Sequence, residues 1–296
     1  MNRNELLTKV AAINVWTQGD QRAPHKPLLI LLALGRAANI GHSPLPYDEI
    51  EDGLRNLIKE FGPYRRQYNP IYPFWRLQND GLWEVYSAIS EAKIGPGGEP
   101  PVAWMRTAFG RFPPEMTEVI INDPTVIDTI VEEVLGSHFP ETLHEDILAA
   151  VGLTLGEPST ARLPRDPTFR DRIMVAYEYR CAMCGWDLNL GHHPVGLEAA
   201  HIKWRQARGP DIEGNGLALC VAHHKLFDCG AFTVDLNSSK ILVSELLFGS
   251  DSHRENVLLR YHGEELAKPQ RDEDRPKSEY ILWHQREVFK GRARNL

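Results

Sequence analysis

Cysteine and histidine residues between positions 181 and 224 are spaced like metal ligands. Cys181 and Cys184 are separated by two residues, and the same interval recurs at Cys220 and His223. Thiolates and an imidazole suit tetrahedral zinc, and two pairs of short spacing let each pair supply two ligands. Because four protein ligands leave no position for water, the predicted metal is a structural Zn²⁺ that contributes to folding.

The fourth cysteine does not fit this pattern. Cys229 has no partner at the same spacing, so we expect a packed thiol outside the metal site. The alternative for the whole cluster is buried apolar cysteines and a surface histidine. That alternative does not explain why both pairs share one spacing.

Three further polar residues, His201, Asn215 and His224, could act on a phosphodiester. Hydrolysis needs a base that activates water, a divalent cation that neutralises charge, and a group that orients the base. The run VGLEAAHI predicts a strand ending at His201, and LCVAHHKLFD predicts a helix beginning near Cys220. Neighbouring helical residues project about 100° apart, so His223 turns to the zinc and His224 toward the strand. A ββα-metal unit is therefore predicted.

The segments LEAAHI, NGLALC and HHKLFD resemble the HNH endonuclease family, over roughly residues 168–243. This resemblance implies that His201 is the general base and that His224 binds a catalytic divalent cation, Mg²⁺ or Mn²⁺. It also implies that Asn215 fixes the loop or helps to hold the cation or the phosphate.

One position departs from the family pattern. Many members carry an acidic metal ligand immediately before the first histidine, where this chain has Ala200. Glu198 lies two residues before Ala200, but alternation along a strand turns its side chain away from His201. Glu198 is therefore not assigned as a ligand, and the full ligand set of the cation stays open.

Length and composition favour a soluble, cytoplasmic protein. The 296 residues exceed what one core usually organises, and no apolar run approaches the roughly 20 residues that span a bilayer. The start, MNRNELLTKVAAINVW, predicts a helix and not a signal peptide. Four cysteines mostly committed to metal indicate a reducing compartment.

The net charge of −7 is unevenly distributed. Residues 91–155 contain eleven acidic and three basic side chains, so the remainder of the chain is close to neutral. Local basic patches at either end are therefore free to contact phosphates. The overall acidity does not exclude DNA as a partner.

Glycine, proline and small polar residues interrupt the helical pattern at GLTLGEPSTARLPRDPT. We expect an α+β protein with a mainly helical amino-terminal domain (1–152), a linker (153–167) and a nuclease domain (168–296). Predicted helices of the first domain are 3–16, 27–40, 47–61, 102–111, 115–122, 124–137 and 141–151.

Two other elements are predicted from local signals. Asn79-Asp80-Gly81, within FWRLQNDGLWEVY, predicts a β-hairpin wing. Residues 278–291 predict a terminal helix, with Trp283, Val288 and Phe289 packed on the nuclease domain.

The amino-terminal segments DQRAPHKPLLILLALGRA and NPIYPFWRLQNDGLWEV resemble the sulfur-recognising domain of restriction endonucleases that act on phosphorothioate-modified DNA. The resemblance covers much of residues 10–90. It implies that domain 1–152 binds double-stranded DNA and selects the modified form.

Physical reasoning about a sulfur site is compatible with these residues. Sulfur is more polarisable than oxygen and a weaker hydrogen-bond acceptor, so it gains more from apolar contact and loses less on leaving water. Tyr72 and Pro73 are the predicted apolar wall, completed by His25 and the Lys26 stem. Lys26 or Arg22 offsets the phosphate charge.

A neighbouring loop, FGPYRRQYNP, adds Arg65 and Arg66 as predicted contacts to phosphates or bases, although paired surface arginines are common. The alternative for the pocket is that Pro24 and Pro27 shape a helix start and that Tyr72 is a core aromatic residue.

Together these features predict a modification-dependent restriction endonuclease. One alternative is an HNH nuclease that reads a modified base such as methylcytosine. Another is a catalytically degenerate, zinc-stabilised DNA-binding protein, which Ala200 would indicate. Because one HNH site cuts one strand, a double-strand break requires a homodimer or two successive cuts, and both stay open.

Overall fold

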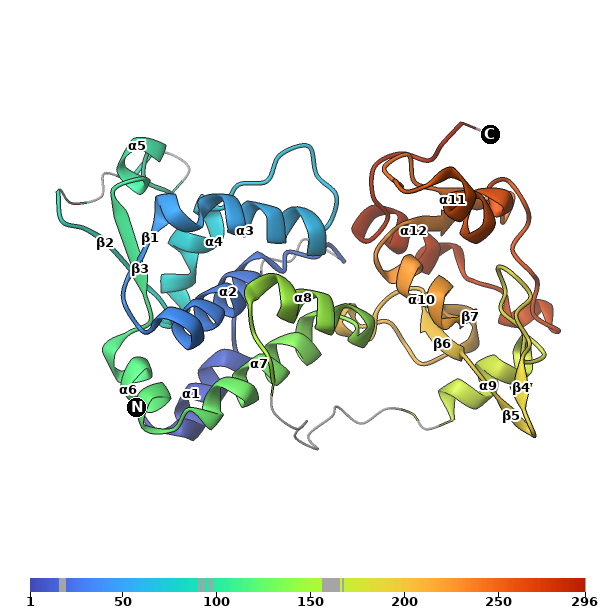
Figure 1. Ribbon diagram of the computed structural model, residues 1–296, viewed down its shortest axis with the longest axis horizontal. Helices are drawn as coiled ribbons and strands as arrows, with labels where there is room; N and C mark the ends of the chain where they lie inside the picture. Colours follow the sequence, from blue (N-terminus) through green and yellow to red (C-terminus); the bar gives the residue numbers. More distant parts are fainter. Residues whose placement is uncertain are drawn as a thin grey trace. The chain divides into compact units, whose positions relative to one another are not determined.

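The computed structural model describes residues 1–15, 20–89, 91, 94–95, 98–155, 166 and 168–295. The chain divides into two compact units, Met1–Arg162 and Leu163–Leu296 (Figure 1). Most of the predicted linker, residues 156–165 and 167, lies outside the described residues. Among the described helices, none is long and apolar enough to cross a membrane.

The first unit consists of helices and one small antiparallel sheet (Figure 1). Its α-helices are α1 (Arg3–Ala11), α2 (His25–Ile40), α3 (Tyr47–Phe61), α4 (Ile71–Arg76), α5 (Val102–Met105), α6 (Pro114–Asn122), α7 (Thr125–His138) and α8 (His144–Val151). Short 3₁₀ helices are η1 (Leu77–Asp80) and η2 (Glu141–Leu143). The sheet has the order β1-β3-β2, from β1 (Leu45–Pro46), β2 (Glu84–Ser87) and β3 (Ala108–Arg111).

Helix α2 is the centre of this unit. Its sequence is apolar on all sides, and every residue from Leu28 to Gly35 is buried. A helix with this pattern needs neighbours around its whole circumference. Helices α3, α4, α7 and α8 supply them (Figure 1), so the first residues of α2 are held on a rigid core element.

The hairpin predicted within FWRLQNDGLWEVY is wrong. Its first half forms α4 and η1, and the turn signal ends that helical segment at Gly81, where φ is +67°. Phe74 packs edge-on against Tyr47 and Trp83, with ring centroids 5.0 and 5.6 Å away. The contact with Tyr47 of α3 joins separate elements and stabilises a helix where local turn chemistry predicts a strand.

The helix predicted over 102–111 is wrong in its second half. The chain leaves α5 after Met105 and forms β3, the central strand of the sheet. Ala108 and Gly110 are buried while Phe109 and Arg111 are half-buried, which is the alternation of a strand with one face on the core. The wing is therefore a three-stranded sheet that pairs segments distant in sequence.

Within its described residues, 166 and 168–295, the second unit contains three antiparallel strand pairs. These are β4 (Asn189–Leu190) with β5 (His193–Pro194), β6 (Leu197–His201) with β7 (Gly216–Cys220), and β8 (Phe232–Val234) with β9 (Ile241–Val243). Its α-helices are α9 (Phe169–Ala176), α10 (Val221–Asp228), α11 (Asp251–Val257) and α12 (Ser278–Glu287). Its 3₁₀ helices are η3 (Arg205–Ala207), η4 (Glu213–Asn215), η5 (Leu259–Tyr261) and η6 (Asp272–Asp274).

The pair β6–β7 carries the residues of chemical interest. Its register runs from Leu197 opposite Cys220 to His201 opposite Gly216, and both α9 and α10 pack on it. The predicted strand ending at His201 and the helix beginning after Cys220 are confirmed, as is the α+β class.

The terminal helix is shorter than predicted. Helix α12 ends at Glu287, four residues before the predicted end. Trp283, Val288 and Phe289 are buried, as expected from the sequence.

Candidate functional site

Three thiols and one imidazole converge where β7 meets α10. The ligand atoms of Cys181, Cys184, Cys220 and His223 all lie within 4.8 Å of one another. His223 Nδ1 is 3.2 Å from Cys220 Sγ and 3.7 Å from Cys181 Sγ. This donor set fits a tetrahedral soft-metal site. Over the part of the chain that the structure describes, it is the one such convergence of cysteine, histidine and carboxylate groups.

The backbone and a second contact of His223 position these ligands. Gly185 adopts φ +74° and its N–H donates to Cys181 O at 2.8 Å, which tightens the first cysteine pair into a turn. His223 Nε2 donates to Val257 O at 2.8 Å, so Nδ1 points at the thiols. Burial alone lowers the pKa of His223, but hydrogen bonds with Cys181 and Cys220 raise it to about 10.

His201 lies at the end of β6 and is held on two sides. Its Nε2 is 2.7 Å from Asp211 Oδ1, and its ring stacks on Phe169 of α9 with centroids 4.2 Å apart. Burial lowers the pKa of His201, while the hydrogen bond to Asp211 opposes that effect. Near neutral pH the imidazole is therefore uncharged and able to accept a proton.

Asn215 is fully buried and holds the loop between β6 and β7. Its Oδ1 accepts from the Lys203 N–H at 2.8 Å, and its Nδ2 donates to Lys203 O and Pro210 O at 3.0 and 2.9 Å. Of the roles that the family resemblance implies, these contacts support the fixing of the loop. A side chain without exposed surface offers no atom to a phosphate.

His224 lies between two carboxylates. Its Nδ1 is 2.7 Å from Glu198 Oε2 and its Nε2 is 3.2 Å from Asp228 Oδ2. Asp228 is buried, and its Oδ1 accepts a hydrogen bond from Trp204 Nε1 at 2.9 Å. Burial alone lowers the pKa of His224, but Asp228 and then Glu198 raise it to about 10.

The structure gives Glu198 a partner that the sequence did not indicate. Glu198 contacts His224, which reaches the strand from α10, through its Oε2 at 2.7 Å. Ala200, two residues along the same face, is fully buried in the core. An acid at position 200 would have to displace apolar packing, whereas Glu198 already supplies a carboxylate to His224.

Sequence reasoning did not single out Asp211 and Asp228. For Asp228 a signal exists, because in HHKLFD it follows His224 by four residues and such pairs share one helix face. For Asp211 no periodic signal exists, since it lies in a loop ten residues beyond His201.

Several cationic residues proposed to contact DNA surround the start of α2. His25 is the first residue of this helix, and its pKa is lowered to about 4 by burial, then by the charges of Arg65 and Arg22. Arg22 also donates to Phe61 O at 3.3 Å. Lys26 is held differently: its Nζ lies 2.6 Å from Asp80 Oδ2 and 2.9 Å from Asn14 O.

The remaining predicted DNA contacts lie on α4 and on the loop before it. Tyr72 has 45% of its surface exposed, and the guanidinium of Arg76 lies 5.1 Å from its ring centroid. Pro73 is buried, whereas Arg66 is exposed. Because α4 packs against α2, the Tyr72 helix and the His25 helix are neighbours.

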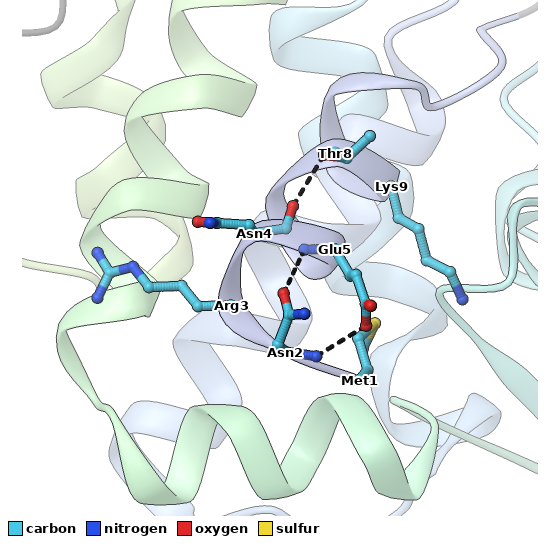
Figure 2. Close-up of a pocket in the computed structure, with 7 residues that line it drawn as sticks. All are labelled: Met1, Asn2, Arg3, Asn4, Glu5, Thr8 and Lys9. Carbon is cyan, nitrogen blue, oxygen red and sulfur yellow. Dashed lines mark hydrogen bonds between the residues drawn. The ribbon is translucent and has the colours of Figure 1, made fainter.

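A hollow on the first unit lies along α1 and contains none of the predicted site residues. Figure 2 shows that Asn2 and Glu5 close a capping box there, with both hydrogen bonds at 2.9 Å. The polar groups are used to begin the helix, so we assign the hollow no ligand.

The second unit is a ββα unit with a cysteine-histidine cluster, and a helical unit precedes it in the sequence. Residues 181–235 match the HNH endonuclease family. Residues 3–155, more than half of the chain, match the ScoMcrA-like DNA sulfur-binding domain family. The chain therefore belongs to the ScoMcrA-like DNA sulfur-binding domain family and also carries an HNH endonuclease domain. Both predicted resemblances are confirmed.

Solved structures with similar folds include two sulfur-binding domains complexed with phosphorothioated DNA. That of ScoMcrA is 20% identical, with a TM-score of 0.43, and the match covers 50% of this chain and 94% of that one. That of SprMcrA is 18% identical, with a TM-score of 0.42 and coverage of 52% and 95%. The type IV phosphorothioation-dependent restriction endonuclease ScoMcrA is 21% identical, with a TM-score of 0.41 and coverage of 58% and 38%. No curated protein matches the chain, so the assignment rests on the two domain families.

Proposed function

We propose that this protein is a cytoplasmic, modification-dependent restriction endonuclease. It binds phosphorothioate-modified double-stranded DNA through its first unit and hydrolyses a nearby phosphodiester bond in its second. The observation that carries the proposal is the joining, in one chain, of a sulfur-binding domain to an HNH domain. Two sulfur-binding domains of similar fold were solved with phosphorothioated DNA.

Recognition of sulfur depends on an apolar contact beside cationic groups. Tyr72 is the exposed aromatic residue of α4, whereas its neighbour Pro73 is buried, so the apolar contact is assigned to Tyr72. Arg22 and Arg65, whose charges both act on His25, offset the phosphate charge, and exposed Arg66 adds a further contact. A phosphate oxygen against Tyr72 would lose its water without gaining donors, so unmodified DNA is penalised.

The cluster of Cys181, Cys184, Cys220 and His223 is proposed to hold a structural Zn²⁺. Three thiolates and one imidazole complete a tetrahedron and leave no position for water. Hydrogen bonds from Cys184 and Cys220 hold the pKa of the Cys181 thiol well below its usual value. The same contacts raise the pKa of the Cys184 thiol, so a bound metal would be needed to hold all three sulfurs as thiolates.

Glu198 and His224 are proposed to hold the catalytic Mg²⁺ or Mn²⁺. A carboxylate with an imidazole suits either cation. The Glu198 side chain is 44% exposed, whereas Asp228 is 2% exposed and bonded to Trp204. Asp228 therefore orients His224 through Nε2, and Nδ1 faces the accessible carboxylate. When bound, the cation neutralises charge on the phosphate and the leaving oxygen.

His201 is the proposed general base. Its neutral imidazole removes a proton from the attacking water, while Asn215 keeps the preceding loop in place. Stacking on Phe169 fixes the plane of the ring. Because one such site acts on one strand, double-strand cleavage is expected to require a homodimer or two successive cuts.

The test is cleavage of matched duplexes that differ at one stereodefined phosphorothioate, in Mg²⁺ or Mn²⁺. We expect cleavage of the sulfur duplex and a loss of about 10² to 10⁴ in rate for His201→Ala, the range of a general base. Equal rates for wild type and His201→Ala would contradict the assigned base. Preference for a cytosine-methylated duplex would identify a base reader, and binding without cleavage would identify a degenerate nuclease.

Recognition is tested separately by Tyr72→Ala in a gel-shift assay. Affinity for the sulfur duplex should fall about tenfold, the loss of an aromatic contact worth roughly 1.4 kcal/mol. Tyr86→Ala is the matched control, because Tyr86 is an exposed tyrosine of the same unit on β2. Equal losses on sulfur and oxygen duplexes would reject the apolar contact.

A further inference from the structure

The carboxylate of Asp211 lies against the proposed base. Asp211 Oδ1 is 2.7 Å from His201 Nε2, and both side chains are mostly shielded from water, at 23% and 18% exposed. A second contact of the imidazole is apolar: the Phe169 ring stacks on it with an angle of 16° between the two ring planes. The imidazole can neither rotate nor tilt without losing one of these contacts.

Asp211 is held in place by contacts from separate segments. Its Oδ2 accepts from the backbone N–H of Asp166 at 3.4 Å, and Arg205 Nε lies 3.6 Å from Oδ1. Its carbonyl oxygen accepts from Arg172 Nη2 at 2.7 Å, and the same guanidinium pairs with Glu213 at 2.8 Å. These contacts hold Asp211 in position independently of its contact with His201.

The loop also requires a glycine close to Asp211. A Cβ at Gly209 would lie 1.7 Å from Lys203 O and 2.9 Å from Asn215 Nδ2. Only glycine permits this approach of the chain to itself. Asn215 and Gly209 therefore close a turn, and this turn places the Asp211 carboxylate next to His201.

The contact determines which nitrogen of His201 is basic. A neutral imidazole carries its proton on one nitrogen, and a carboxylate accepts only from the protonated one. With Nε2–H donating to Asp211, the lone pair is on Nδ1. As the imidazole becomes charged, the nearby carboxylate stabilises that charge.

We propose that Asp211 is the positioning residue of the nuclease site: it selects the Nε2–H tautomer of His201 and stabilises the imidazolium formed during cleavage. The inference rests on the proposed nuclease function. His201 Nδ1 accepts a proton from water as the water oxygen bonds to phosphorus. The bond from phosphorus to the leaving oxygen breaks, and that oxygen takes its electron pair and a proton from solvent. Asp211 keeps its negative charge throughout.

Asp211→Asn is the informative substitution, because it keeps the shape and removes the charge. We expect the single-turnover cleavage rate to fall about 10- to 100-fold, the usual effect of losing a group that orients a site ligand. The DNA concentration for half-maximal rate should stay within about twofold, because Asp211 does not contact DNA in this proposal. Asp187→Asn, an exposed carboxylate of the same unit, is the matched control.

The pH profile separates positioning from a loss of fold. The charges that act on His201 are those of Asp211, Arg205 and Asp228. Since Asp211 raises the basicity of His201, Asp211→Asn should move the acidic limb of the rate profile to lower pH. An unmoved limb together with a wild-type rate would overturn the proposal.

A second measurement does not depend on cleavage. In the full chain with ¹⁵N-labelled histidine, the signals of His201 are assigned by their loss in His201→Ala. We expect the Nε2–H tautomer in the wild type and a shift toward Nδ1–H in Asp211→Asn. An Nδ1–H tautomer in the wild type would overturn the proposal even if Asp211→Asn fails to fold. If the wild type cuts no DNA, the nuclease function fails while the tautomer still tests Asp211.

Discussion

His25 and His138 of the first unit and His223 and His224 of the second unit have pKa values shifted in opposite directions. In the first unit, burial and nearby arginines lower the pKa of His25 and His138 to about 4. In the second, thiols or carboxylates outweigh burial and raise the pKa of His223 and His224 to about 10. Burial alone therefore does not decide the charge of a histidine. The neighbouring groups decide it: arginines act on His25 and His138, whereas thiols or carboxylates contact His223 and His224.

Removal of zinc should change the second unit and not the first, and this is the largest effect that we expect. A structural zinc contributes on the order of 10 kcal/mol to folding, so Cys220→Ser or chelation should unfold the second unit and leave the first folded. Hydrogen exchange along the full chain, read by mass spectrometry, locates the loss. Cys229→Ser is the matched control, since Cys229 lies outside the cluster. Protection retained over residues 181–228 without metal would contradict a structural zinc.

Neutralising Glu198 should affect catalysis and leave folding intact. In Glu198→Gln the concentration of Mn²⁺ that gives half-maximal cleavage should rise about 10- to 100-fold, because a neutral amide is a weaker ligand beside His224. Titration of the cleavage rate with Mn²⁺ measures this shift. Glu255→Gln, an exposed glutamate on α11, should leave the titration unchanged. An unchanged titration in Glu198→Gln would exclude Glu198 as a ligand.

Lowering the pH should reduce the free energy of unfolding of the first unit, by less than removal of zinc reduces that of the second. Because the folded pKa of His138 is about 4, below its ordinary 6.5, the unfolded chain takes up a proton first as pH falls. Stability is therefore complete above about pH 6.5 and decreases toward pH 4, by about 1 to 2 kcal/mol per histidine at pH 5. The shift of His224 has the opposite sign and gives no loss in this range.

Thermal unfolding between pH 7 and pH 5 measures this acid effect. His138→Gln should flatten the pH dependence of the first transition, because the glutamine cannot take up a proton. A slope equal to that of the wild type would show that His138 is not the titrating group.

Local signals predicted those elements that local interactions decide. The apolar run of α2 and the strand that ends at His201 follow from periodicity, and both form as expected. The segment around Phe74 does not, because it packs against Tyr47, which lies on the separate helix α3. Periodicity carries no information about such contacts.

In the site, too, some residues could be predicted from local sequence signals and others could not. Cysteine and histidine spacing singled out the four residues that converge, since each pair is local. The carboxylates around the other histidines come from a strand, a loop and a helix end. Asp211 in particular reaches His201 through a turn closed by Asn215 and Gly209, and only the folded loop reveals that arrangement.

His223 and His224, which are adjacent on α10, connect the cysteine-histidine cluster to the proposed cation site. His223 belongs to the cysteine-histidine cluster, and the next residue, on the same turn of α10, contacts Glu198. A metal bound at the cluster would anchor the start of α10 and so hold His224 toward Glu198 and Asp228. Loss of a metal from the cluster would therefore disturb the proposed cation ligand as well as the fold of the second unit.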